Sequence, residues 1–160
     1  MALTQAQYTA LKADIIADPA FNSVPDNSDG DFAIAQAYNL EANPAFVVWK
    51  TDIPTSEAKQ AMSWVEYIGR SDGERDAWQF MLSNGTINAG DVNVRQGIQD
   101  VFNGPNGVDS RTALIAIAKR NASRAEKLFS TGTGSDAVPA TMSHQGNLSY
   151  QDVGIARRNT

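Results

Sequence analysis

Acidic side chains are the groups in this sequence that could carry chemistry, and one short cluster contains Asp72, Glu74 and Asp76. Two carboxylates can hydrolyse a glycosidic bond when they flank it at roughly 5 to 10 Å. Negative charge at such spacing is also typical of the first turn of a helix, where it meets the positive end of the helix dipole. We therefore expect these three acids to stabilise a helix rather than to catalyse a reaction.

A second acidic cluster, Asp26, Asp29 and Asp31, lies in a stretch rich in Asn, Ser and Gly. Its spacing departs from that of a calcium-binding EF-hand loop, and no glutamate follows at the EF-hand distance. The glycine-containing segment 104–107 lacks the Gly-Lys-Ser/Thr ending of a phosphate-binding loop, and Pro105 removes a backbone donor there. We expect a structural loop in both places.

Nucleophile and metal chemistry is restricted further by composition, because cysteine is absent and histidine occurs once, at His144. Disulfides, thiol nucleophiles and Cys-ligated metals are therefore excluded. A Ser-His-Asp triad or a His-rich zinc site would have to include His144, which lies in a polar stretch where catalytic geometry is hard to hold. The sequence predicts a protein that is not an enzyme, with no catalytic residue, no metal site and no cofactor.

Most of the chain shows the patterns of helices with recognisable ends. Thr4 and Gln7 match a capping box, and apolar residues then recur at helical spacing until Asp18. Further helical patterns cover residues 32–43, 54–69, 71–83, 91–102 and 109–129, with a kink expected near Asn121 and Ser123 in the last. Helices joined by short polar loops predict an all-α fold, a helical bundle that forms a body over residues 1–130.

Two aromatic features are expected in the interior of this body. The run Ala45–Trp49 is β-branched and aromatic, but no second convincing strand is visible, so we interpret it as a buried extended connector. The tryptophans Trp49, Trp64 and Trp78 are expected to anchor the core.

Residues 131–160 form a second part, which begins at the linker Gly132–Ser135 and has few sizeable apolar side chains. Such a segment alone cannot bury enough surface to offset its ordering entropy. We predict an extended C-terminal arm that docks on a partner, with a disordered terminus as the alternative. Ser149 and Asp152 match a capping pair that could begin a short docked helix. The predicted partner-binding residues are Val138, Met142, Leu148, Tyr150, Val153, Arg157 and Arg158.

Charge is distributed unevenly along the chain, although the formal net charge is only −5. Residues up to Asp109 include fifteen acidic and six basic ones, whereas the remainder has three acidic and seven basic ones. Blocks of opposite sign can attract each other in trans, which favours head-to-tail association. The predicted oligomer contacts are Arg120, Arg124 and Lys127. The basic stretch 111–127 has two other interpretations, a nucleic-acid contact or a solvated helix face. The absence of interleaved aromatic residues weakens the nucleic-acid interpretation and favours the solvated face.

Membrane insertion is not expected, because no apolar run approaches the roughly 18 to 20 residues that span a bilayer. The N-terminal residues also lack the basic and apolar regions of a signal peptide. We therefore expect the protein to act inside the cell that makes it.

Four blocks occur in a distinctive order along the chain: Phe46–Thr51 (FVVWKT), Arg124–Gly134 (RAEKLFSTGTG), Pro139–Met142 (PATM) and Leu148–Val153 (LSYQDV). Together they resemble a family of small proteins encoded among the head and neck genes of tailed bacteriophages. The most specific part is the RAEKLF block, followed by the Gly/Thr linker and SYQDV. The helical stretches between the blocks match loosely.

The resemblance implies a structural virion protein, made in the host cytoplasm and located in the neck. Similar proteins are head-to-tail adaptors or connectors, in which a helical body forms a ring under the portal, here expected as a dodecamer, and C-terminal arms grip portal subunits. The implied partners are the portal protein and the tail or nozzle proteins, with packaged DNA as a further contact of the basic stretch. Two alternatives are another phage structural role, in capsid decoration or the tail, and an adaptor with a secondary cell-wall-degrading activity.

Overall fold

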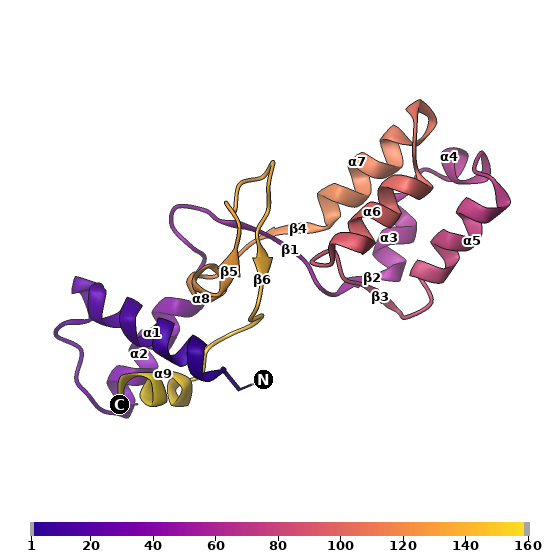
Figure 1. Cartoon of the computed structure of the whole chain (residues 1–160). Coiled ribbons are helices and arrows are strands. Elements are labelled where there is room, and N and C mark those ends of the chain that lie inside the picture. The colour runs from indigo at the N-terminus through magenta and orange to yellow at the C-terminus, as the bar shows by residue number, and fades with distance from the viewer. Residues whose placement is uncertain (1, 159–160) are drawn as a thin grey trace. The chain divides into compact units, whose positions relative to one another are not determined.

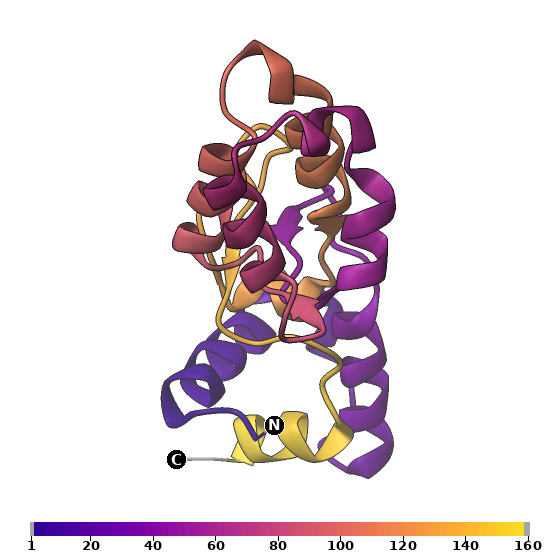
Figure 2. The same cartoon turned by 90° about the vertical axis from the view of Figure 1, so that its right-hand side faces the viewer.

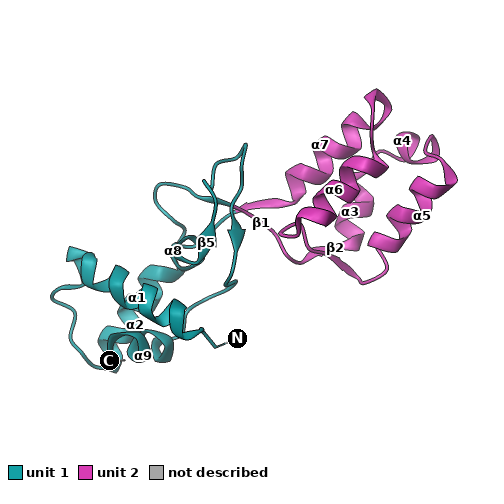
Figure 3. Ribbon diagram, in the orientation of Figure 1, with its two compact units in different colours: residues 1–47, 121–160 teal, residues 48–120 magenta. Residues whose placement is uncertain are grey.

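The computed structural model describes residues 2–158, and the chain divides into two compact units. Unit 1 combines residues 1–47 with residues 121–160, and unit 2 consists of residues 48–120 (Figure 3). The expected boundary between residues 130 and 131 is therefore wrong for the compact units, because the C-terminal residues pack with the N-terminal helices. The chain is mostly helical, with small strand pairs (Figure 1).

Unit 1 contains four α-helices, one 3-10 helix and an antiparallel pair of short strands within its described residues. They are α1 (Gln5–Ala17), η1 (Pro19–Phe21), α2 (Ser28–Asn39), α8 (Arg124–Leu128), β5 (Ser130–Thr131), β6 (Thr141–Met142) and α9 (Tyr150–Arg158). The capping box of Thr4 and Gln7 is present at the start of α1, as predicted. A second capping box, formed by Ser123 and Glu126, begins α8.

The C-terminal residues complete the core of unit 1 and do not form an extended arm. Helix α9 packs against α1 and α2, so the first and last helices of the chain lie side by side in Figure 1 and in Figure 2. Leu148, Val153 and Ala156 are at most 3% exposed and pack in the same cluster as Leu11 and Ile34. The segment is too poor in apolar residues to fold alone. It needs to cover only one side of a core to which α1 and α2 also contribute.

Unit 2 is a compact group of helices around Trp78, whose ring contacts Phe102 edge-on at 5.2 Å between centroids. The chain enters it through β1 (Val47–Trp49), leaves it through β4 (Lys119–Asn121), and these two strands pair. The expectation that the run 45–49 has no partner strand was therefore wrong. The remaining elements are β2 (Ile53–Pro54), α3 (Thr55–Ala61), α4 (Trp64–Ile68), α5 (Asp72–Met81), β3 (Thr86–Ile87), α6 (Val92–Val101), η2 (Pro105–Gly107) and α7 (Val108–Ile117), with β2 antiparallel to β3.

Two expected helices are interrupted in the structure, and a serine starts the second part of each. The pattern over residues 109–129 becomes α7, β4 and α8, so the expected kink is a complete break. The pattern over residues 54–69 becomes α3 and α4, and the Ser63 hydroxyl accepts the backbone N–H of Glu66 at the new helix start. The break turns Trp64 outward, and the side chain expected in the core is 63% exposed.

Helix α4 is held against the start of α7 by a carboxylate. Glu66 accepts the backbone N–H groups of Asp109 at 3.1 Å and Ser110 at 2.8 Å. The Ser110 hydroxyl in turn accepts the backbone N–H of Ser63 at 3.0 Å. Partial burial raises the pKa of Glu66, but the hydrogen bonds from Ser110 and Asp109 outweigh it and leave this pKa below its usual value.

The depressed pKa of Glu66 should make the stability of unit 2 depend on acid. A carboxyl group whose pKa is lower in the folded chain stabilises the fold above its unfolded pKa, about 4.3, and this contribution is lost as the pH falls through the folded pKa. We expect Glu66→Gln to lower the Tm at pH 7 and to flatten the loss of Tm between about pH 5 and 3. Tryptophan fluorescence measures the thermal unfolding of unit 2, because all three tryptophans lie in that unit. Glu57→Gln, a surface control in the same unit, should keep the wild-type slope; an unchanged slope in Glu66→Gln would contradict the assignment.

The docking of α9 can be tested with two matched truncations in the C-terminal segment. Val153 is fully buried and Val138 is 58% exposed. Val153→Ala should lower the free energy of unfolding by about 2 kcal/mol through lost burial and a residual cavity, whereas Val138→Ala should change it by less than about 0.5 kcal/mol. Urea unfolding followed by far-UV circular dichroism measures both. Equal stability of the two variants would mean that α9 is not part of the core.

Candidate interaction site

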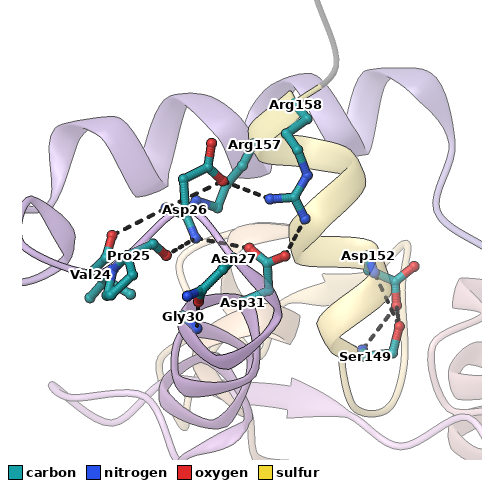
Figure 4. A network of polar contacts seen from close by, with 10 residues as sticks. All are labelled: Val24, Pro25, Asp26, Asn27, Gly30, Asp31, Ser149, Asp152, Arg157 and Arg158. Carbon is teal, nitrogen blue, oxygen red and sulfur yellow. Dashed lines mark hydrogen bonds and ion pairs between the residues drawn. The ribbon is translucent and has the colours of Figure 1, made fainter.

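Two arginines near the end of α9 bind a buried carboxylate at the start of α2 (Figure 4). Arg157 Nη1 lies 2.8 Å from Asp31 Oδ1, and Arg158 Nη2 pairs with the other oxygen of the same carboxylate. Asp31 is only 1% exposed. A buried carboxylate is costly unless cations and hydrogen bonds compensate it, so this group requires the end of the chain to be in place.

The loop before α2 adds further partners to these arginines. Arg158 Nη1 lies 2.6 Å from Asp26 Oδ1, and hydrogen bonds to Asp31 and Asp26 raise the pKa of Arg158. Arg157 Nη1 also donates to the carbonyl of Pro25 at 3.0 Å. We call the group Asp26, Asp31, Arg157 and Arg158 the C-terminal latch. It closes unit 1 by joining its first and last segments.

A glycine allows α9 to approach the latch closely. A Cβ atom at Gly154 would lie 2.8 Å from Asp31 Oδ2, closer than such atoms normally come. The loop has a similar requirement, because a Cβ at Gly30 would lie 1.9 Å from the carbonyl oxygen of Pro25. Asn27 caps α2 by accepting the N–H of Gly30 at 3.0 Å. The two glycines and the cap therefore position Asp31 beneath the arginines.

The start of α9 is fixed by the capping pair that the sequence predicted. Ser149 N–H donates to Asp152 Oδ2 at 2.9 Å, and Asp152 N–H donates to the Ser149 hydroxyl at 3.1 Å. The phenol of Tyr8 donates to Asp152 Oδ1 at 3.2 Å, and burial together with the Asp152 charge raises the pKa of Tyr8. Just before the helix, the Asn39 side chain donates to the carbonyl of Leu148 and accepts its N–H, at 2.9 and 2.8 Å. The predicted helix therefore docks on its own chain.

A second cationic cluster surrounds Arg124, one of the predicted oligomer contacts. Its guanidinium lies 2.6 Å from Asp18 Oδ2 and 2.9 Å from Asp14 Oδ2. It also lies over the rings of Tyr38 and Phe21, at 4.4 and 5.2 Å from their centroids. Burial and the hydrogen bond that Tyr38 donates to Asp14 raise the pKa of Tyr38 well above its usual value. Arg124 is thus engaged within unit 1.

These contacts change the interpretation of the charge asymmetry. The basic C-terminal residues Arg124, Arg157 and Arg158 bind acidic residues of the N-terminal segment in cis, where the sequence suggested attraction in trans. Unit 1 has nine acidic and five basic residues, and unit 2 has nine and eight, so neither unit is basic. Of the other predicted oligomer contacts, Lys127 places its ammonium 5.6 Å from the ring centroid of Phe46, and Arg120 lies in β4.

The predicted partner-binding residues fall into different environments. Leu148 and Val153 are buried in unit 1, so neither side chain is accessible to a partner in this structure. Met142 is half-buried in β6. Val138 and Tyr150 are 58% and 46% exposed, and these two remain candidates for contacts outside the chain. The two arginines of the prediction belong to the C-terminal latch.

Two of the three residues of the first acidic cluster, Asp72 and Glu74, lie in the first turn of α5 as predicted, whereas Asp76 lies beyond that turn. Ser71 and Glu74 form a capping box at the start of α5, and Asp72 pairs with Arg75. Hydrogen bonds from Ser71 lower the pKa of Glu74, whereas the acid catalyst of a glycoside hydrolase needs a raised pKa.

Within residues 2–158, no helix is long and apolar enough to cross a membrane.

Sequence reasoning missed a group of exposed apolar side chains in unit 2. On α4, Trp64 is 63% exposed, Val65 is 76% exposed and Ile68 is 52% exposed. The apolar spacing suggested a buried stripe of one long helix. The available signal was Ser63 with Glu66, a Ser-x-x-Glu pattern that marks a helix start inside that stretch.

A comparison of the chain with protein families, curated proteins and solved structures finds no match.

The contribution of the C-terminal latch to stability can be tested by comparing substitutions of Asp31 and of its exposed neighbour Asp29. Asp31→Asn leaves two arginines without their buried counter-charge and should lower the free energy of unfolding by about 3 kcal/mol. Asp29→Asn, on the exposed side of the same helix turn, should change it by less than about 0.5 kcal/mol. Chemical denaturation of both variants at neutral pH measures the difference. Similar small effects in the two variants would show that the latch contributes little.

Proposed function

We propose that this protein is a structural protein of the tailed-bacteriophage virion and acts as a head-to-tail adaptor in the neck. In this proposal a helical-bundle body of all-α type forms a ring, a dodecamer, with the portal protein and the tail or nozzle proteins as partners. The supporting observation is that the four blocks which carry the phage resemblance, although far apart in sequence, meet largely within unit 1.

Backbone hydrogen bonds join the blocks directly. The N–H of Val47, in the FVVWKT block, donates to the carbonyl of Gly134 at 2.7 Å. The carbonyl of Val47 accepts the N–H of Ala140, in the PATM block, at 2.9 Å. The β5–β6 pair then connects the end of the RAEKLF block to PATM. Three of the four blocks therefore share one hydrogen-bonded framework.

The fourth block is tied to the same body. Glu126 of RAEKLF accepts the N–H of Gly146 at 3.0 Å, just before the LSYQDV block begins at Leu148. Leu148 and Phe129 then pack in one apolar cluster. The four blocks of the resemblance therefore contribute to one folded unit. This supports the proposal, because a structural protein of an assembly needs such a unit to form its contacts.

The structure changes how the C-terminal segment would act in an adaptor. A grip on the portal through Leu148 and Val153 would first require α9 to leave the core of unit 1. In the folded chain, the segment offers Val138 and Tyr150 at the surface. We therefore assign the portal contact of this segment to these two exposed residues. Ring formation would use heterologous contacts between copies.

Co-sedimentation of the full chain with purified portal rings from the same phage tests the proposal. Wild type should co-sediment, and a Val138→Asp, Tyr150→Asp double variant should bind at least about tenfold more weakly, because charge would enter an apolar contact. Ile16→Asp, at a residue 69% exposed on α1, is the matched control and should bind like wild type. Deletion of residues 131–160 is unsuitable, because it removes core residues.

A wild-type protein that fails to co-sediment would contradict the portal contact. Immunogold labelling of intact particles then distinguishes the positions in the virion: label at the neck agrees with the adaptor, and label on the capsid or along the tail favours the alternative structural roles. Particles without label would contradict a virion protein altogether.

A further inference from the structure

The exposed side chains of α4 form an apolar surface at one corner of unit 2. Trp64, Val65 and Ile68 are each more than half exposed, and Val108 at the start of α7 is 45% exposed. Val108 adjoins Asp109, whose N–H is bound by Glu66 of α4, so the start of α7 lies beside this helix. We call these four apolar residues the α4 surface. Large exposed apolar groups that gather in one place mark interaction sites more often than scattered ones do.

The α4 surface is held rigid by contacts on its inner side. The ring of Trp64 lies 5.3 Å from that of Tyr67, which is 8% exposed and accepts a hydrogen bond from Gln79 at 2.8 Å. Arg70, also 8% exposed, donates to the carbonyls of Glu66 at 3.2 Å and Asn103 at 3.0 Å. A tryptophan positioned before binding loses little conformational entropy when a partner covers it.

Two exposed acidic residues, Asp72 and Asp109, lie beside the α4 surface. Asp72 follows α4, and its side chain is 91% exposed, while Asp109 is exposed next to Val108. The nearby cation Arg75 is paired with Asp72 and donates to the carbonyl of Ile68 at 3.1 Å. A partner with Lys or Arg next to its apolar residues would complement this rim.

We infer that the α4 surface binds a segment of another protein in which apolar side chains are flanked by Lys or Arg. A second copy packed through the same surface is disfavoured, because a two-fold contact would bring the two acidic rims together. An anionic membrane is disfavoured for the same electrostatic reason. The inference stands independently of the virion role, because it uses only the contacts and charges of unit 2.

The probe is a fluorescein-labelled amphipathic helical peptide of Leu and Lys, with a Leu and Glu peptide of the same pattern as its matched control. Fluorescence anisotropy with the full-length protein should show binding of the Leu/Lys peptide and at least about tenfold weaker binding of the Leu/Glu peptide. Trp64→Ala should weaken the Leu/Lys complex at least about tenfold, and Ile68→Ser should do so at least about threefold. Both residues are more than half exposed, so circular dichroism should show unchanged folding.

Two further variants separate the apolar and the charged contributions. The double variant Asp72→Asn, Asp109→Asn should weaken the Leu/Lys complex severalfold and reduce its dependence on salt, because screened charge pairs would be lost. Ile16→Asp, on unit 1, should bind like wild type. The inference is overturned if the wild type does not bind the Leu/Lys peptide, if the Leu/Glu peptide binds equally well, or if Trp64→Ala binds with wild-type affinity.

Discussion

The buried carboxylate of Asp31 constrains the whole of unit 1. Removing an ionised carboxylate from water costs several kcal/mol unless opposite charge and hydrogen bonds replace the lost solvation. Both cations that compensate Asp31, Arg157 and Arg158, come from the last turn of the final helix. The same docking places Val153 in the core, so the electrostatic and apolar contributions of α9 depend on each other.

The two units therefore reach stability by different routes. Unit 1 is assembled from the two ends of the chain, and its core closes only when α9 covers α1 and α2. Unit 2 is continuous in sequence and encloses Trp78 with neighbouring helices. Unit 1 contains the C-terminal latch, and unit 2 contains the α4 surface.

Helix starts were the most predictable part of this protein, because a cap requires only residues three positions apart. The pairs Thr4 with Gln7 and Ser149 with Asp152 cap helices as expected, and Ser71 with Glu74 forms a further capping box. Ser63 and Ser123 have the same signature but lie inside longer apolar patterns. There the periodicity favoured continuous helices, and tertiary packing of the flanking segments broke them.

Local chemistry in the chain was thus sufficient to establish a mostly helical protein and the ends of several helices. The loop expected for the second acidic cluster was wrong for Asp29 and Asp31, because α2 begins at Ser28 and both residues lie in its first turn. Whether the basic C-terminal residues pair in cis or in trans was decided by tertiary structure, because both arrangements satisfy the same charges. The C-terminal segment illustrates the reason most directly: its composition excludes an independent core, but burial of Leu148 and Val153 depends on a surface that residues 3–38 and 125–129 provide. Exposure of Trp64 follows from the same principle, since a break at Ser63 changes which side of the following turn faces the core.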